Sequence, residues 1–153
     1  MRTYFDHEKL DVYQSELRFI AWVTALLVNI KQRSTNARIA EVSDQLDRAS
    51  LSALLNTAEG NGRRQRRTRA KFFDDARGSV TECAACLDAL VAKGVCSGGE
   101  TDEGKQLLLR IASMLTRLIE RFDFSSSSSI IREEADQEAF EDEDENENEH
   151  EQS

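Results

Sequence analysis

Apolar residues recur at steps of three and four along residues 1–124, which is the spacing of one face of an α-helix. Four such stretches follow one another, and none shows the alternation typical of a strand. The first predicts a helix at about residues 6–32. Its apolar stripe is Leu10, Tyr13, Leu17, Ala21, Thr24 and Val28, widened by Ile20 and Leu27. The second has one stripe made of Ile39, Val42, Leu46, Ala49 and Ala53, and another made of Leu51, Leu54, Leu55 and Ala58. A helix that is apolar on two faces contacts more than one neighbour.

The third and fourth stretches are also amphipathic. The third carries Phe72, Ala76, Ser79, Cys83, Leu87 and Leu90. The fourth carries Leu107, Leu108, Ile111, Leu115, Leu118, Ile119 and Phe122. Four such helices joined by short connections bury their stripes against one another, which favours an antiparallel up-and-down four-helix bundle. The predicted fold class is therefore all-α.

Residues at the ends of these stretches predict where the helices stop and start. Gly60-Asn61-Gly62 should end the second helix, because glycine readily takes the left-handed conformation of a helix stop. Lys93-Gly94-Val95 has the form of a helix end for the same reason. Thr101 is the predicted cap of the fourth helix.

The chain changes character after residue 124. Five serines at 125–129 predict a flexible linker, and residues 133–151 are acidic low-complexity sequence. Their charges repel, and they carry too little apolar surface to offset the entropy of ordering. The predicted division is a four-helix bundle domain at 1–124, and a Ser-rich linker and disordered acidic tail at 125–153.

The net charge of −9 is likewise divided between two parts of opposite sign. Residues 1–124 hold 19 Lys and Arg against 17 Asp and Glu, a net of +2. Residues 125–153 hold one Arg against 12 acids, a net of −11. Each part therefore implies its own class of partner.

A cytoplasmic location is predicted from three features. The first nine residues are too polar for a signal peptide. The longest apolar stretch, from Phe19 to Ile30, is interrupted by Thr24 and Asn29 and is shorter than the roughly 20 residues of a membrane span. Three cysteines imply no disulfide framework. We expect no membrane association.

Two polar-rich motifs carry a resemblance to a known family. The first, at residues 45–63, has the form Q-x-x-R-A-x-x-S-x-x-x-N-x-A-E-G-x-G-R, supplied here by Gln45, Arg48, Ala49, Ser52, Asn56, Ala58, Glu59, Gly60, Gly62 and Arg63. The second is similar to F-L-x-x-A-R-G-S-x-x-E and lies within residues 71–82. In order and spacing the chain resembles, over roughly residues 5–122, the four-helix-bundle proteins encoded in intervening sequences of bacterial 23S rRNA genes. Arg69 and Asp75 depart from that pattern, because the family commonly has apolar residues there.

The resemblance implies a ring-like homopentamer of bundles. The fold is also similar to that of the accessory protein of diversity-generating retroelements, a basic pentamer that binds nucleic acid and the reverse transcriptase. For this chain the resemblance therefore implies self-association and an association with RNA or DNA.

A basic run supplies the candidate nucleic-acid-binding residues. Between residues 60 and 78 the net charge is +5. Its cations are Arg63, Arg64, Arg66, Arg67, Arg69, Lys71 and Arg77. The planar fork of arginine suits phosphate oxygens, and a ring of subunits would multiply the local field. The alternative is a solvated helix start whose cations meet acids of neighbouring subunits.

A second group of polar residues lies at helical spacing: Asn56, Glu59, Arg63, Arg77, Ser79 and Glu82. Residues three apart on a helix share one side, as Asn56 with Glu59 and Ser79 with Glu82 do. These four predict a structural polar network at a helix or subunit contact, because buried polar groups must be paired. A ligand site is the alternative.

No constellation for catalysis is present, so we expect a protein that is not an enzyme and has no small-molecule substrate. Cys83 and Cys86 form a C-x-x-C in mid-helix, with Cys96 further on. No nearby histidine completes a metal site, and core packing is the favoured interpretation. No cofactor and no metal are expected.

Two functions thus remain open from the sequence: an oligomeric, nucleic-acid-associated accessory protein, or a protein–protein interaction scaffold. The acidic tail is either a solubilising appendage or a tethered polyanion that competes for the basic run.

Overall fold

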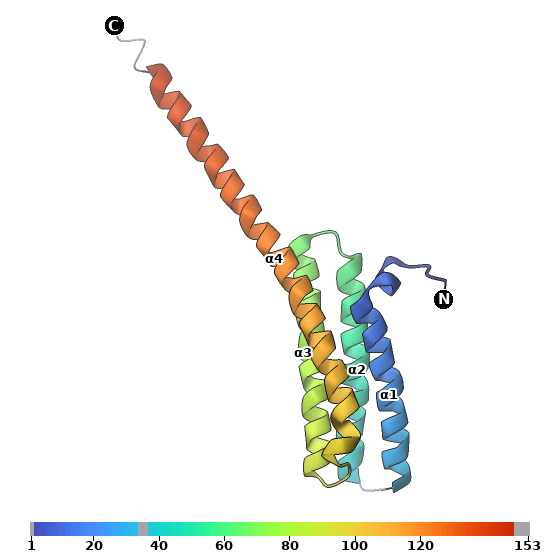
Figure 1. Ribbon diagram of the computed structural model, residues 1–153. Coiled ribbons are helices and arrows are strands. Elements are labelled where there is room, and N and C mark those ends of the chain that lie inside the picture. Colours follow the sequence, from blue (N-terminus) through green and yellow to red (C-terminus); the bar gives the residue numbers. More distant parts are fainter. Residues whose placement is uncertain (1, 34–36, 149–153) are drawn as a thin grey trace.

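A computed structural model describes the backbone of residues 2–33 and 37–148 and the side chains of residues 2–33 and 39–123. The elements are a short 3-10 helix, η1 (Asp6–Lys9), and four α-helices, α1 (Asp11–Arg33), α2 (Ala37–Gly62), α3 (Arg66–Ala92) and α4 (Gly98–Asn148). They run up and down beside one another (Figure 1). The described residues contain no strand, and the predicted all-α four-helix fold is confirmed.

One interior joins all four helices. Its fully buried large residues come from each of them: Val23, Ile30, Leu46, Phe73, Leu87, Leu90, Ile111 and Leu115. The most extensive contacts of α3 are with α2 and α4, and α1 packs against α2 and α4. η1 lies against α1 and α2. The stripes predicted for α3 and α4 face this interior.

The stripe predicted for α1 is wrong at four of its six positions, whereas Leu10 and the widening residue Leu27 pack against the core. Leu17, Ala21, Thr24 and Val28 are exposed. The buried face carries Val12, Ser15, Glu16, Phe19, Val23 and Ile30. Both faces of α1 carry apolar residues. Because the buried face also contains the polar residues Ser15 and Glu16, its sequence resembles that of a solvent-exposed face. The helix also begins at Asp11 rather than near residue 6, because Leu10 is extended and separates it from η1.

Both helices end where the glycines predict, since α2 stops at Gly62, but the left-handed conformation is found only at the end of α3 among the described residues. Gly94 has a φ of 73°, and Val95 N donates to Leu90 O at 3.1 Å, which confirms the predicted end of α3. Gly60 and Gly62 instead keep a helical backbone. A Cβ at Gly60 would lie 3.0 Å from Phe72 Cβ and from Phe73 Cε1. Glycine is therefore required there by the close approach of α3.

The cap of α4 is Ser97, and the predicted cap Thr101 lies inside the helix. Ser97 Oγ accepts a hydrogen bond from Glu100 N at 3.2 Å, and Glu100 Oε2 accepts one from Ser97 N at 2.8 Å. This reciprocal pair is a capping box. Buried Thr101 donates to Gly98 O at 3.1 Å.

Where α4 enters the bundle it fits closely against α1. A Cβ at Gly104 would lie only 2.2 Å from Trp22 Cζ3, so the indole of Trp22 rests on bare backbone. Trp22 also lies beside Phe19, with ring centroids 5.7 Å apart.

After the bundle ends, α4 continues as a helix to Asn148 and extends away from the other helices (Figure 1). The predicted linker and disordered tail at 125–153 stay a prediction: the backbone of residues 125–148 belongs to α4, and residues 149–153 lie outside the described residues. No proline or glycine follows Gly104, so nothing in the sequence breaks the helix. Within the described residues, no helix is long and apolar enough to cross a membrane.

Candidate nucleic-acid interface

The basic run lies at one end of the bundle, across the end of α2, the α2–α3 turn and the start of α3. Its side chains at residues 63, 64, 66, 67 and 71 are exposed, and those at 69 and 77 are half-buried. The extended part of α4 leaves the bundle at this same end (Figure 1). The exposed cations at 63, 64, 66, 67 and 71 therefore lie at one end of the bundle, which we call the basic end, whereas Arg77 lies about three turns further along α3, beside Thr116 of α4.

Three of these cations have an acidic partner three or four residues away in the sequence. Arg63 pairs with Glu59. Lys71 Nζ lies 3.1 Å from Asp75 Oδ2, and Arg77 Nη2 lies 3.1 Å from Asp74 Oδ1. Exposed pairs of this kind contribute little to stability, roughly 0–1 kcal/mol each. A stronger anion such as a phosphate can therefore displace them at small cost.

Two further arginines pack on the ring of Phe122 in α4. The guanidinium carbons of Arg66 and Arg69 lie 5.4 and 4.5 Å from the ring centroid. Arg69 also donates to Asn61 Oδ1 at 3.3 Å, and its buried Nε has no hydrogen-bond partner. Arg69 thus joins α2, α3 and α4, whereas Arg66 keeps an exposed face.

Arg64 and Arg67 have neither a hydrogen bond nor an ion pair with any residue that the structure describes. The first turn of α3 also contains no acidic residue. The amino end of a helix carries partial positive charge, and stability alone favours Asp or Glu there. Arginines at this position strengthen the positive potential at the expense of helix stability, as expected for an anion-binding surface.

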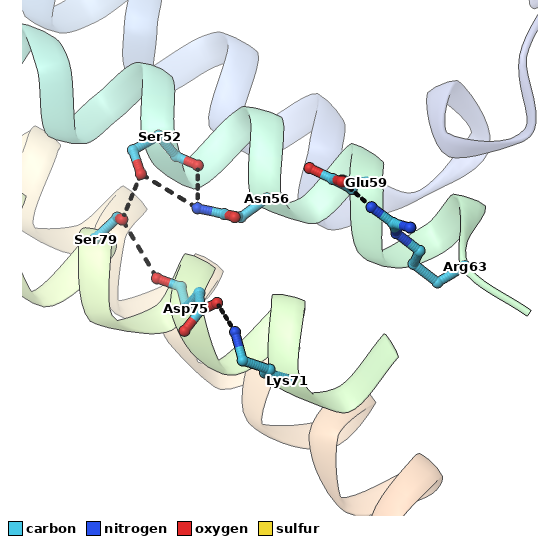
Figure 2. Close-up of polar contacts among 7 residues, drawn as sticks. All are labelled: Ser52, Asn56, Glu59, Arg63, Lys71, Asp75 and Ser79. Atoms are coloured by element: carbon cyan, nitrogen blue, oxygen red, sulfur yellow. Dashed lines mark hydrogen bonds and ion pairs between the residues drawn. The ribbon is translucent and has the colours of Figure 1, made fainter. Parts of the chain in front are cut away.

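The predicted polar network is formed only in part (Figure 2). Ser52 Oγ lies 2.9 Å from Ser79 Oγ across the α2–α3 contact, and Asn56 Nδ2 donates to Ser52 O at 3.0 Å. Glu59 binds Arg63 instead of this cluster. Glu82 is exposed and has no hydrogen bond or ion pair with the described residues.

Ser52 belonged to the first sequence motif but was not predicted as a member of the network. Ser79 Oγ also approaches Asp75 O at 3.3 Å (Figure 2). These contacts join two packed helices, which fits a structural network better than a ligand site.

A comparison with known families decides the assignment. The model of the 23S rRNA-intervening sequence protein family matches residues 8–117. The chain belongs to that family. The match extends from η1 into α4 and includes the whole basic run. No curated protein matches the chain.

Within the part matched by the family, α1 and α2 share an exposed apolar face. On α2, Leu51 and Leu55 are 50% and 56% exposed. On α1, Leu17 and Val28 are exposed as well. A groove between the helices is lined by Thr24, Leu27, Val28, Ile30, Lys31, Ile39, Ala40, Ser43, Asp44 and Asp47. Leu51 and Leu55 follow Asp47 at helical spacing, so they continue the α2 side of this groove. We call this surface the α1–α2 face.

The cysteines of this family member lie in or near the interior. Cys83 and Cys96 are buried, Cys86 is half-buried, and all three are free. Burial raises the pKa of the Cys83 thiol to about 12. Such a thiol packs as a small apolar group and is a poor nucleophile.

Proposed function

We propose that this member of the 23S rRNA-intervening sequence protein family is a non-enzymatic, cytoplasmic, oligomeric accessory protein that binds RNA or DNA through its basic end. The observation that carries the proposal is the pair Arg64 and Arg67, exposed and without acidic partners among the described residues, at the amino end of α3. Arg63 and Arg66 lie beside them, held by the rings of Phe72 and Phe122 at 5.0 and 5.4 Å.

The chemistry of such a surface favours backbone contacts. Guanidinium groups bind phosphate oxygens in a forked geometry, and neutralised phosphates release their counterions. A hollow that runs from the basic end along α3 is lined by Arg67, Lys71 and Arg77 together with Asp74 and Asp123, and its cations suit phosphate oxygens. Binding through the basic end should therefore be sensitive to salt and largely independent of sequence.

Removing four arginines should weaken binding and flatten its salt dependence. We expect Arg63→Ala/Arg64→Ala/Arg66→Ala/Arg67→Ala to reduce the slope of log K against log salt by about 0.7–0.9 for each phosphate that the variant no longer neutralises. The measurement is a titration of fluorescent RNA and DNA across a salt series. The matched control, Arg18→Ala/Arg48→Ala/Lys93→Ala/Arg110→Ala, removes the same charge from exposed positions elsewhere.

The two quadruple variants separate local from general electrostatics. If both weaken binding equally, net charge rather than the basic end is responsible. If wild-type binding ignores salt and survives the arginine substitutions, the protein-interaction scaffold becomes the better interpretation.

Self-association is the second part of the proposal, and the α1–α2 face supports it. Several leucine-sized side chains exposed together favour a protein interface over a solvated surface. The occupant we propose is a second copy of this chain, in the ring of five implied by the resemblance. α2 then has the two apolar contacts that its two stripes predict.

Replacing exposed leucines of the α1–α2 face with arginine should dissociate the assembly. We expect light scattering to give about five times the chain mass of 17.3 kDa for the wild type. Leu51→Arg/Leu55→Arg should give a monomer that keeps its helical circular dichroism. Leu109→Arg, at a 70% exposed position on α4, is the control and should leave the mass unchanged. A wild-type monomer at micromolar concentration would contradict this part of the proposal.

A further inference from the structure

Two large aromatic side chains near the amino end of the chain stand in solvent. Tyr4 is 75% exposed and Phe5 is 66% exposed. α1 and α2 run in opposite directions, so this segment lies at the end of the bundle where α2 stops and the basic run begins (Figure 1). Two exposed rings and a cluster of arginines therefore share one end of the molecule.

The segment that carries these rings is held in place by its own hydrogen bonds. The Glu8 carboxylate accepts a hydrogen bond from Tyr4 N at 2.5 Å and another from Phe5 N at 3.1 Å. Both bonds lower the pKa of Glu8, so it is ionised at neutral pH. Gln14 of α1 donates to Glu8 O at 2.9 Å. The backbone beneath the two rings is thus fixed to η1 and α1.

The rings themselves also have ordered neighbours. Phe5 stacks on His7 with ring centroids 5.7 Å apart, and His7 meets Tyr13 edge-on at 4.8 Å. The Arg2 guanidinium lies 5.5 Å from the centroid of the Tyr4 ring. These contacts position the rings without covering them. Burying an aromatic side chain stabilises a protein, so two ordered but exposed rings contribute less to folding than they could.

Proteins that bind single-stranded nucleic acid commonly combine exposed aromatic rings with nearby cations. Unpaired bases stack on aromatic side chains, while arginines and lysines follow the phosphates. A duplex keeps its bases stacked on one another and cannot use exposed rings in this way. A purely electrostatic surface needs arginines alone, so the aromatic residues favour a single strand.

We propose that Tyr4 and Phe5 are base-stacking residues, and that the ligand of the basic end is single-stranded RNA or DNA. This inference rests on the proposed function and names the class of nucleic acid that the same end of the bundle takes. Bases would lie on Tyr4 and Phe5, and the phosphates on either side would contact Arg2 and the arginines of the α2–α3 turn.

The test compares single and double strands on the full-length protein. The probes are fluorescent oligouridine and oligoadenosine of about 12 nucleotides, within the range that one single-strand site covers, and the duplex of the two. Wild-type protein should bind either single strand more tightly than the duplex. Tyr4→Ala/Phe5→Ala should weaken single-strand binding roughly tenfold or more and leave duplex binding within about twofold.

The salt dependence separates stacking from charge. Because a ring releases no counterions, Tyr4→Ala/Phe5→Ala should keep the wild-type slope of log K against log salt, whereas the four-arginine variant should reduce it. Tyr4→Phe/Phe5→Tyr keeps both rings and should restore the wild-type affinity. Tyr4→Trp should add a fluorescence signal that oligonucleotides quench beyond the quenching of Trp22 in the wild type.

Each failure has its own signature. If duplex and single strands bind equally and removal of the rings changes nothing, while the arginine variant still weakens binding, the stacking inference is wrong and the proposed function stands. If no probe binds in a salt-dependent manner, the proposed function fails as well. If Tyr4→Ala/Phe5→Ala instead changes the mass in solution, the rings belong to a protein contact and the inference is overturned.

Discussion

The free energy of unfolding should fall by on the order of 4 kcal/mol as the pH is raised from about 5 to about 9, and Glu16→Gln should remove most of that fall. The cause is a carboxyl group inside the bundle. Glu16 is only 2% exposed, and Thr57 Oγ1 donates to its Oε1 at 2.6 Å. Its Oε2 has no hydrogen-bond partner.

Burial raises the pKa of Glu16 from 4.5 to about 8, and the hydrogen bond from Thr57 offsets only part of that rise. No charged group adds to the shift. The folded protein therefore holds a proton on Glu16 between pH 4.5 and about 8, whereas the unfolded chain has released it. Because the folded state binds more protons in that window, stability declines as the pH rises through it and levels off above about 8.

Denaturant unfolding, followed by circular dichroism at several pH values, is the measurement. Glu16→Gln keeps the shape of the side chain but has no proton to lose, so its stability should be nearly flat from about pH 5 to 9. The wild type should be the more stable protein at low pH and the less stable one at high pH. Parallel curves for the two proteins would show that Glu16 does not titrate in this range.

Gly104→Ala should destabilise the bundle by at least about 2 kcal/mol, because overpacking outweighs the gain in helix propensity. The added methyl would lie 2.2 Å from Trp22 Cζ3 and 2.3 Å from Cη2. The ring cannot move inward without displacing Phe19, its neighbour at 5.7 Å. Trp22 is the single tryptophan of the chain, so its fluorescence reports the displacement directly.

Gly78→Ala is the matched control for this substitution. Gly78 also lies within a helix, but nothing lies within 4 Å of a Cβ placed there. That variant should be stabilised by up to about 1 kcal/mol, with an unchanged tryptophan spectrum. If the two alanine variants have the same stability and the same emission maximum, the close fit of α1 on α4 does not exist in solution.

Periodicity predicted the number of helices and their arrangement, because every helix buries an apolar stripe in one interior. It predicted the wrong face of α1, since the inner face carries Ser15 and Glu16 while the outer face carries Leu17 and Val28. A sequence pattern cannot tell a core face with a buried acid from an interface face. The contacts of the folded chain are needed to separate them.

The clustering of cations at the basic end could be predicted from the sequence, because six of them fall within residues 63–71. Which of those arginines are engaged could not be predicted, since Phe122 and Asn61 reach them from other helices. Glu16 and the Tyr4–Phe5 pair were also missed. The Ser97-to-Glu100 spacing is a capping signal that the sequence does show, and it would have placed the start of α4 correctly.

The path of α4 decides how far the acidic residues from Glu133 onward lie from the basic end. At about 1.5 Å per residue, Glu133 lies roughly 16 Å along the axis from Phe122, on whose ring Arg66 and Arg69 rest. Physiological salt screens exposed charges beyond about 8 Å, so an unbroken α4 keeps the two charge clusters electrostatically independent. Only a bend at the five serines, which are weaker helix formers than alanine, would bring the carboxylates within range of the guanidinium groups. Opposite charge alone is therefore not enough for the acidic part of α4 to attract the arginines of the basic end. The strength of that attraction depends on the ionic strength and on whether α4 stays one continuous helix.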